Sequence, residues 1–150
     1  MIAALTLTLV GHVEERFMQS DTQPAPVSRK MLWAGYITSA LPVLMLLFSA
    51  ILKFVKPADV VKEFVDRFGY GESLLLGIGI VELTCTVVYV IPRTSVLGAI
   101  LLTGYLGGAT ATHLRIGDPS FVTPVIVGVL VWGGLWLRDA GVRALIPLRR

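Results

Sequence analysis

Glu82 is the residue whose type and position could do chemistry, because it stands near the middle of a long apolar run, residues 73–91. A carboxylate at that depth in a membrane is expensive, so a functional role is its default interpretation. Folding the chain back at the short link 92–95 places Glu82 level with Tyr105. One interpretation is a small polar pocket at the membrane midplane that binds a quinone head group or relays a proton. The other is a neutral Glu82 that holds the helices together by a hydrogen bond to Tyr105 or to a backbone carbonyl.

A second candidate site lies where the third apolar run ends, at His113 and Arg115. Lys53, Glu72 and Asp118 are expected at a similar level. A histidine at a helix end is most often an interface residue; the alternative is that His113 and Arg115 bind an anionic ligand or a partner at the mouth of the bundle. A conventional metal site is not expected, because the second histidine of the chain lies far away, near the N-terminus.

Glycines cluster in the third apolar run, and we interpret Gly104, Gly107 and Gly108 as helix-packing residues. Gly104 and Gly108 form a GxxxG pair, which lets two membrane helices approach closely. A phosphate-binding loop is excluded because the glycines lie inside a helix with no strand before them. The chain also lacks a nucleophile elbow and a facing pair of haem-binding histidines, so no residue is expected to be catalytic.

Four apolar runs must position these residues: 31–52, 73–91, 96–114 and 121–137. Each has about 17 to 22 residues, enough for a helix to cross a hydrocarbon core of roughly 30 Å. The longer link, 53–72, carries apolar residues on one helical face and charges on the other. The sequence therefore predicts an all-α fold, a four-helix transmembrane bundle with a short interfacial amphipathic helix between the first two spans.

The composition supports lipid as the solvent. About 55% of the residues are hydrophobic and 15% are charged, against roughly 25% charged in ordinary soluble domains. The basic residues lie between the apolar runs rather than in one stripe, which argues against nucleic acid as a partner. The single cysteine, Cys85, lies inside an apolar run and is interpreted as a packing residue, since one cysteine makes no intrachain disulfide or CxxC pair.

The distribution of lysine and arginine predicts an orientation. Eight of them lie in the N-terminal segment, the 92–95 link and the C-terminal tail, and five lie in the other links. Because cytoplasmic loops are enriched in Lys and Arg, we expect both termini in the cytoplasm.

The first 27 residues fit the bundle poorly. The apolar stretch 2–10 follows no basic segment and is too short to span a membrane, so it makes a poor signal peptide. The codons of residues 14–15 can read GAGGAG, which resembles a bacterial ribosome-binding sequence shortly ahead of Met18. We expect Met18 rather than Met1 to be the true start, and residues 1–27 to be a disordered or mis-annotated leader.

Three stretches resemble the DoxX-like membrane proteins: ELTCTVVYVIPR (82–93), GAILLTGYLGGATATHLR (98–115) and WGGLWLR (132–138). Within the second, GYLGGATATHLR is quite specific. The resemblance covers 28–150 and implies one DoxX-like four-helix domain in the bacterial cytoplasmic (inner) membrane. The positions that match the pattern and carry over as candidates are Glu82, Tyr105, Gly107, Gly108, His113 and Arg115.

The resemblance also implies functions to choose among. The family takes its name from a subunit of a thiosulfate:quinone oxidoreductase, so we expect a non-catalytic or quinone-contacting subunit that works with a soluble or membrane redox enzyme. On its own the chain is not expected to be an enzyme. The alternatives are a structural membrane protein, in which Glu82→Gln would be silent, and a small carrier for a solute or lipid head group, which we would expect to be a homo-oligomer.

Overall fold

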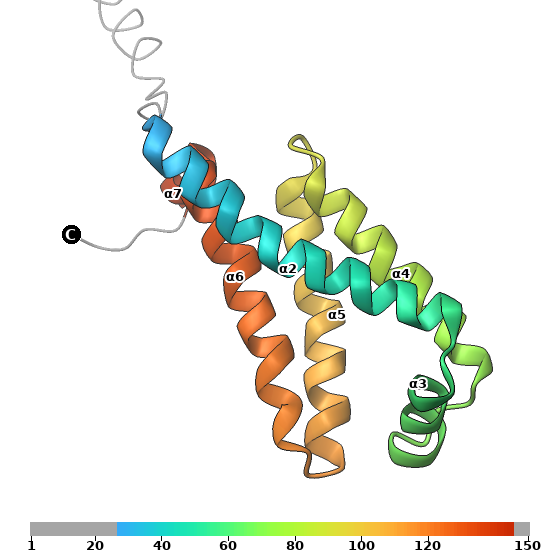
Figure 1. Cartoon of the computed structure of the whole chain (residues 1–150). Helices are drawn as coiled ribbons and strands as arrows, with labels where there is room; N and C mark the ends of the chain where they lie inside the picture. The colour runs from blue at the N-terminus through green and yellow to red at the C-terminus, as the bar shows by residue number, and fades with distance from the viewer. Residues whose placement is uncertain (1–26, 146–150) are drawn as a thin grey trace, which may run out of the picture.

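Four long apolar helices form a bundle in the computed structural model, which describes residues 27–145 (Figure 1). They are α2 (Arg29–Val55), α4 (Ser73–Val90), α5 (Ser95–Arg115) and α6 (Val122–Arg138), the last preceded by the single turn η2 (Pro119–Phe121). All four, with η2 counted into the fourth, are long and apolar enough to cross a membrane. The predicted all-α bundle of four spans is confirmed. The predicted leader, 1–27, and the choice of Met18 as the start lie almost wholly outside the described residues.

Helix α2 is longer than the apolar run that predicted it. It begins after Ser28, whose Oγ accepts a hydrogen bond from the backbone N–H of Met31 at 3.4 Å, as an N-cap does. It ends where Lys56 adopts a left-handed conformation (φ 52°) and donates its N–H to the Leu52 carbonyl. Lys53 therefore belongs to the last turn of α2, and the prediction that the link begins at Lys53 is wrong. Hydropathy ends at the first charge, whereas the helix continues to the next breaker, Pro57.

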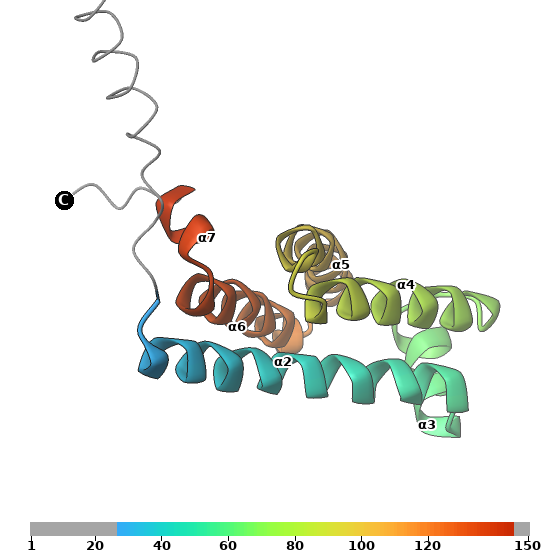
Figure 2. The ribbon, with the colours of Figure 1, turned by 90° about the horizontal axis from the view of Figure 1, so that it is seen from above.

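The bundle closes in the order α2, α4, α5, α6, with each helix packed against its neighbours and α6 returning to α2. The tight link after Ile91 makes α4 and α5 antiparallel, as expected, and α2 crosses the bundle obliquely in Figure 1. Seen from above, α4 and α6 both lie along α2, and α5 lies farther from it (Figure 2).

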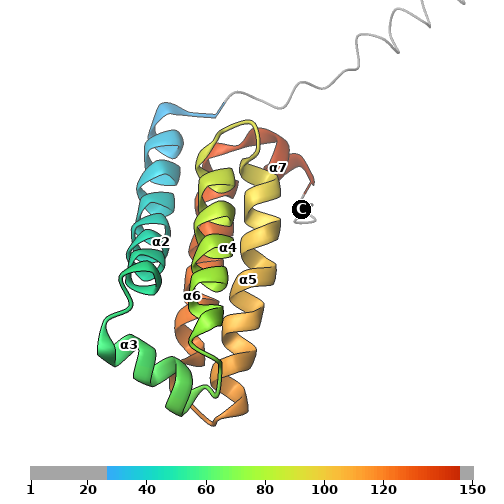
Figure 3. The ribbon, with the colours of Figure 1, turned by 90° about the vertical axis from the view of Figure 1, so that its right-hand side faces the viewer.

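The link between α2 and α4 contains the predicted interfacial helix. It consists of α3 (Ala58–Lys62), which continues without a break into the π-helical turn η1 (Glu63–Arg67). Pro57 precedes it, and Gly69, at φ +70°, ends it in a conformation that glycine adopts without strain. Figure 3 shows this segment lying across one end of the bundle, which we call the α3 end. The short helix α7 (Ala140–Leu145) lies at the opposite end, the α7 end.

Packing is tightest in the half of the bundle next to the α7 end. A Cβ added to Gly98 would lie 2.3 Å from the backbone of Tyr89, so α4 and α5 touch there backbone to backbone. A Cβ on Gly134 would lie 2.3 Å from Ser39 Oγ and 2.9 Å from the Ser39 backbone nitrogen, so α6 and α2 also pack closely there. Tyr89 is fully buried between them. This half is therefore solid, and the space in the molecule lies in the other half.

Candidate functional site

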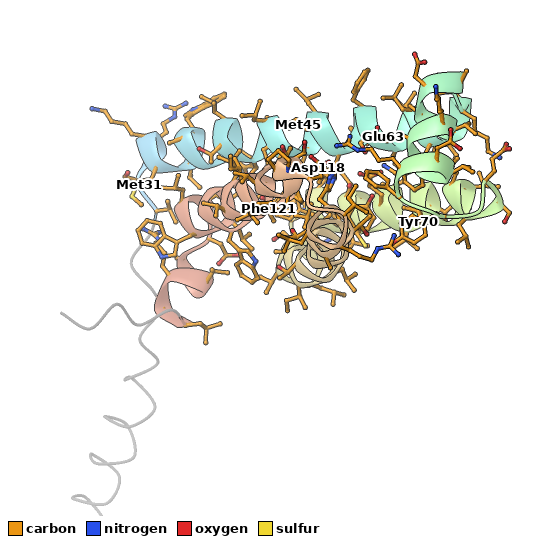
Figure 4. The ribbon with its side chains drawn as sticks, turned by 90° about the horizontal axis from the view of Figure 1, so that it is seen from below. Met31, Met45, Glu63, Tyr70, Asp118 and Phe121 are labelled. Carbon is orange, nitrogen blue, oxygen red and sulfur yellow. The ribbon has the colours of Figure 1, made fainter. Side chains whose placement is uncertain are left out.

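A partly enclosed cavity of about 610 Å³ occupies the half of the bundle next to the α3 end. Its wall is mostly apolar, and that size and lining are typical of small-molecule sites. Figure 4 looks onto this end and labels Met45, Glu63 and Tyr70, which reach the cavity from α2, from η1 and from the loop after η1. The other polar side chains of the wall include Ser49, Lys53, Glu82, Tyr105, Thr112 and His113.

An ion pair between Lys53 and Glu82 is the main polar feature of the cavity wall. Lys53 Nζ lies 2.9 Å from Glu82 Oε2, and the two side chains are 9% and 2% exposed. The same ammonium donates to Ser49 Oγ at 2.6 Å, one turn back on α2. Taking both charges out of water costs several kcal/mol per ion, which only close contact and further hydrogen bonds offset. The pair therefore ties α2 to α4 and presents two opposite charges to the cavity.

Sequence reasoning singled out Glu82 but missed its partner. Hydropathy stops at the lysine and so predicts that it lies in a loop, which leaves Tyr105 or a backbone carbonyl as the expected partner of Glu82. One signal could have identified Lys53. No glycine or proline lies between Lys53 and Pro57, so the sequence is compatible with a helix that continues through Lys53.

Tyr105 does lie in the same cavity as Glu82. It comes from the middle of α5. The two residues that were expected at one level across the α4–α5 hairpin therefore line one cavity, and a hydrogen bond between them stays a prediction. With Lys53, the cavity holds an ammonium, a carboxylate and a phenol on three different helices.

A second polar cluster closes the α3 end around Asp118, which is 4% exposed. Its Oδ2 lies 2.7 Å from His113 Nδ1 and 3.0 Å from Arg67 Nη2, and its Oδ1 accepts from the backbone N–H of Ser120 at 3.0 Å. The Ser120 hydrogen bond, then His113 and the charge of Arg67, lower the pKa of Asp118 from 3.8 to about 2. Asp118 thus joins η1 to the α5–α6 link.

Arg115 also binds the end of η1 and the loop after it. Its guanidinium donates to the Phe68 carbonyl and lies over the Tyr70 ring, 5.6 Å from the centroid. The Tyr70 hydroxyl and Thr112 Oγ1 are 2.8 Å apart. These contacts hold the loop after η1 against α5, beside the cavity.

Residues 37–134 match the DoxX-like family. That is well over half of the chain, from the third turn of α2 to the second-last turn of α6. The chain belongs to the DoxX-like family. The match contains Lys53, Glu82, Tyr105, His113 and Arg115, so every polar group described above lies within the family region. No curated protein and no solved structure is significantly similar to the chain.

In this DoxX-like protein the predicted outer residues, His113 and Arg115, lie at one end but engage groups of their own chain. His113 also lines the cavity, with its ring edge-to-face against Phe68 at 5.1 Å. Their proposed role toward an anionic ligand or partner stays a prediction. Within residues 27–145 no three His, Cys, Asp or Glu side chains lie together as metal ligands would.

Three glycines of α5, Gly104, Gly107 and Gly108, do not pack against another helix of the described chain as the glycines of a close helix pair do. Gly104 and Gly108 line the cavity, and no atom lies within 4 Å of a Cβ built on either of them or on Gly107. Close packing is instead made by Gly98 and Gly134. A helix-packing role for Gly104, Gly107 and Gly108 would need a second protein against α5 and stays a prediction.

Proposed function

We propose that this DoxX-like protein is a non-catalytic membrane subunit that binds a quinone head group in the cavity and works with a redox enzyme. The observation that supports this most directly is the buried Lys53–Glu82 pair in the wall of a largely apolar space of about 610 Å³. Ionisable groups inside a membrane protein are costly, and they mark ligand or proton pathways by default.

The polar groups of the wall match the chemistry of a quinone. A quinone ring carries carbonyl oxygens, which accept hydrogen bonds, and Lys53 and Tyr105 bring donors to the cavity. The reduced form carries hydroxyls, for which the Glu82 carboxylate is an acceptor. The apolar remainder of the wall suits the flat ring, and the isoprenoid tail would lie among the lipids.

The redox chemistry itself is assigned to a partner. With one cysteine in the whole chain, the protein has no dithiol with which to carry electrons alone. The expected arrangement is a soluble or membrane redox enzyme docked on this subunit, in the bacterial cytoplasmic membrane, with both termini of the chain in the cytoplasm.

The solid half of the bundle favours a one-sided binding site over a carrier. Tyr89 is fully buried there, and its hydroxyl lies 2.9 Å from both Ser39 Oγ and the Val131 carbonyl oxygen. A carrier needs a path that opens to each side in turn. The cavity reaches the α3 end, whereas the packing around Tyr89 closes the other half.

The direct test is quinone binding by the purified full-length protein in lipid nanodiscs. We expect a short-chain ubiquinone to bind saturably to the wild type and much more weakly to Glu82→Gln and Lys53→Met. Glu72→Gln is the matched control, because Glu72 is a half-exposed acid at the same end that pairs with Lys56 at 3.5 Å. Quinone extracted with the native protein should follow the same order.

A wild type that binds no quinone, or variants that bind it as the wild type does, would contradict the proposal. If the charge variants fail to fold, Gly108→Leu serves instead. That substitution fills the cavity where no atom lies within 4 Å of the new Cβ, and it leaves the ion pair in place.

A further inference from the structure

The α7 end carries positive charge that the described chain does not balance. The helix ends and the link at that end contain five basic residues, and among residues 27–145 the one acidic residue of these segments is Asp139. Asp139 already accepts from the backbone N–H of Val142 at 3.0 Å, which caps α7. The net charge of the described residues at this end, five positive charges less that of Asp139, is therefore +4. The basic residues are Arg29, Lys30, Arg93, Arg138 and Arg143.

Arg138, the last residue of α6, has one edge of its guanidinium without a partner. Its Nε and Nη2 are buried and have no hydrogen-bond acceptor among the described residues. These two nitrogens lie side by side on one edge of the planar group, and that edge donates two parallel hydrogen bonds to a phosphate or carboxylate.

Two aromatic rings lie beside the same guanidinium. Arg138 Cζ lies over the Tyr89 ring, 5.0 Å from its centroid, and over the Tyr36 ring, 5.7 Å from its centroid. Such cation–π contacts attract the guanidinium to the rings, but they provide no hydrogen-bond acceptor. Arg138 is thus held near two rings while one edge of its guanidinium lacks an acceptor among the described residues, and an oxyanion is the group that such an edge binds best.

A second arginine, Arg143 of α7, also has a buried nitrogen without an acceptor in the described part of the chain. Its Nε is buried and has no partner among the described residues, and Nη1 reaches the Met31 sulfur at 3.6 Å. A thioether is a weak acceptor for a cation. A buried charged donor without an acceptor has lost its hydrogen bonds to water and gained none in exchange, which destabilises the folded chain. Both arginines therefore gain if an anion joins them.

We propose that Arg138 and Arg143 bind a phosphate group, that of an anionic phospholipid head group, between α2, α6 and α7. The aromatic residues beside the site favour a lipid as the source of the phosphate. Trp33 and Tyr36 are 63% and 52% exposed on the same end of α2, where aromatic side chains sit at the level of the head groups. Basic pockets between membrane helices bind lipid head groups in this manner. On binding, Arg143 exchanges the sulfur of Met31 for a phosphate oxygen.

The test uses the full-length protein in an uncharged detergent with three probes: phosphatidylglycerol, phosphatidylcholine and inorganic phosphate. Native mass spectrometry counts retained lipid, and the melting temperature reports binding. We expect the wild type to retain phosphatidylglycerol in preference to phosphatidylcholine and to melt higher with it. Arg138→Gln should weaken the binding of phosphatidylglycerol by roughly tenfold or more. Arg138→Lys keeps the charge but loses the two parallel N–H donors of the guanidinium, so its affinity should lie between those of Arg138→Gln and the wild type.

Arg93→Gln is the matched control, because it removes the same charge from the same end without touching the two arginines. Equal binding by Arg138→Gln and wild type, or an equal loss in Arg93→Gln, would overturn the proposal. If inorganic phosphate raises the melting temperature through Arg138 and phosphatidylglycerol adds nothing, the phosphate comes from solution and the site stands. If Arg138→Gln does not fold, Arg138→Lys and Arg143→Gln decide. The quinone proposal concerns the opposite half of the bundle, so either proposal can fail alone.

Discussion

The pairing of Lys53 with Glu82 changes what each residue means. Alone, a carboxylate in the middle of a span is either neutral or strongly destabilising. With an ammonium at 2.9 Å it becomes half of a dipole that crosses from α2 to α4. Buried pairs of this kind are weak contributors to net stability compared with apolar residues of similar volume, yet the removal of one partner is costly.

Replacing one residue of the Lys53–Glu82 pair should therefore destabilise the protein more than replacing both. We expect Lys53→Met and Glu82→Gln each to cost about 3–5 kcal/mol of unfolding free energy and the double variant Lys53→Met/Glu82→Leu to recover most of it. Denaturation in mixed detergent micelles measures all three. Lys56→Met, which breaks an exposed pair, should change stability by about 1 kcal/mol or less. A double variant as unstable as the single ones would contradict this interpretation.

Asp118 gives the protein an acid-sensitive contact. Its pKa in the folded state is about 2, below the ordinary 3.8. A group with a depressed folded pKa binds protons more readily in the unfolded state, so its contribution is complete above about pH 4 and is lost as the pH falls toward 2. The gap in melting temperature between wild type and Asp118→Asn should be widest above that range and should close as the pH approaches 2. A gap that widens on acidification would refute the assignment.

How much of the site the sequence could predict is clear from individual residues. Glu82 and Tyr105 were identifiable because depth in an apolar run and the fold-back at a tight link are one-dimensional properties. Lys53 was not, because its burial depends on where a helix ends and on which neighbour it meets across the bundle. Asp118 was placed at the right level, but its contact with Arg67 requires η1 to fold over the α3 end, which hydropathy does not encode.

At the level of elements, α5 serves two purposes along its length. Near its start, Gly98 allows backbone contact with α4, and farther on Gly104 and Gly108 leave space for the cavity. Sequence alone does not separate these two kinds of glycine, because a glycine in a helix looks the same whether a neighbouring helix or empty space lies beside it.

Alanine substitutions should separate these two kinds of glycine. Gly98→Ala should destabilise by about 1–3 kcal/mol, because its Cβ would lie 2.3 Å from the Tyr89 backbone. Gly104→Ala should be neutral or slightly stabilising, since its Cβ meets nothing within 4 Å and alanine is the better helix former. Melting temperatures of the two variants in one detergent decide the matter. Similar losses at both positions would mean that Gly104 packs against a second protein.

The whole molecule is asymmetric along the membrane normal. A cavity lined in part by η1 and the loop after it lies toward one end, and a closely packed, basic end lies at the other. The four spans and their antiparallel order were predictable, because length and hydropathy determine which segments cross a bilayer and short links determine which are neighbours. The position of the cavity was not, since it depends on side-chain volumes summed over all four helices.

The orientation of the whole chain can be tested independently of any ligand. We expect reporter enzymes fused after Leu145 and in the 91–94 link to be active in the cytoplasm, and a reporter inserted at Gly71 to be active outside, in line with the excess of Lys and Arg at the α7 end. Accessibility of single cysteines to a membrane-impermeant thiol reagent, in a Cys85→Ala background, provides the control. Labelling of the α7 end from outside intact cells would reverse the assignment.

The order of the chain bears on how Glu82 enters the membrane at all. Synthesis proceeds from the N-terminus, so α2 is in place before α4 emerges, with Lys53 at its trailing end, where a long side chain reaches the interface. When α4 enters the membrane with Glu82, its counter-charge Lys53 is therefore already present on α2. The pair can form before α5 and α6 have been synthesised. If the carboxylate stood on α2 and the lysine on α4, the final contact would be the same. The carboxylate would then enter the lipid before its counter-charge had been made. The sequence order thus lets the nascent protein neutralise its most expensive residue during insertion.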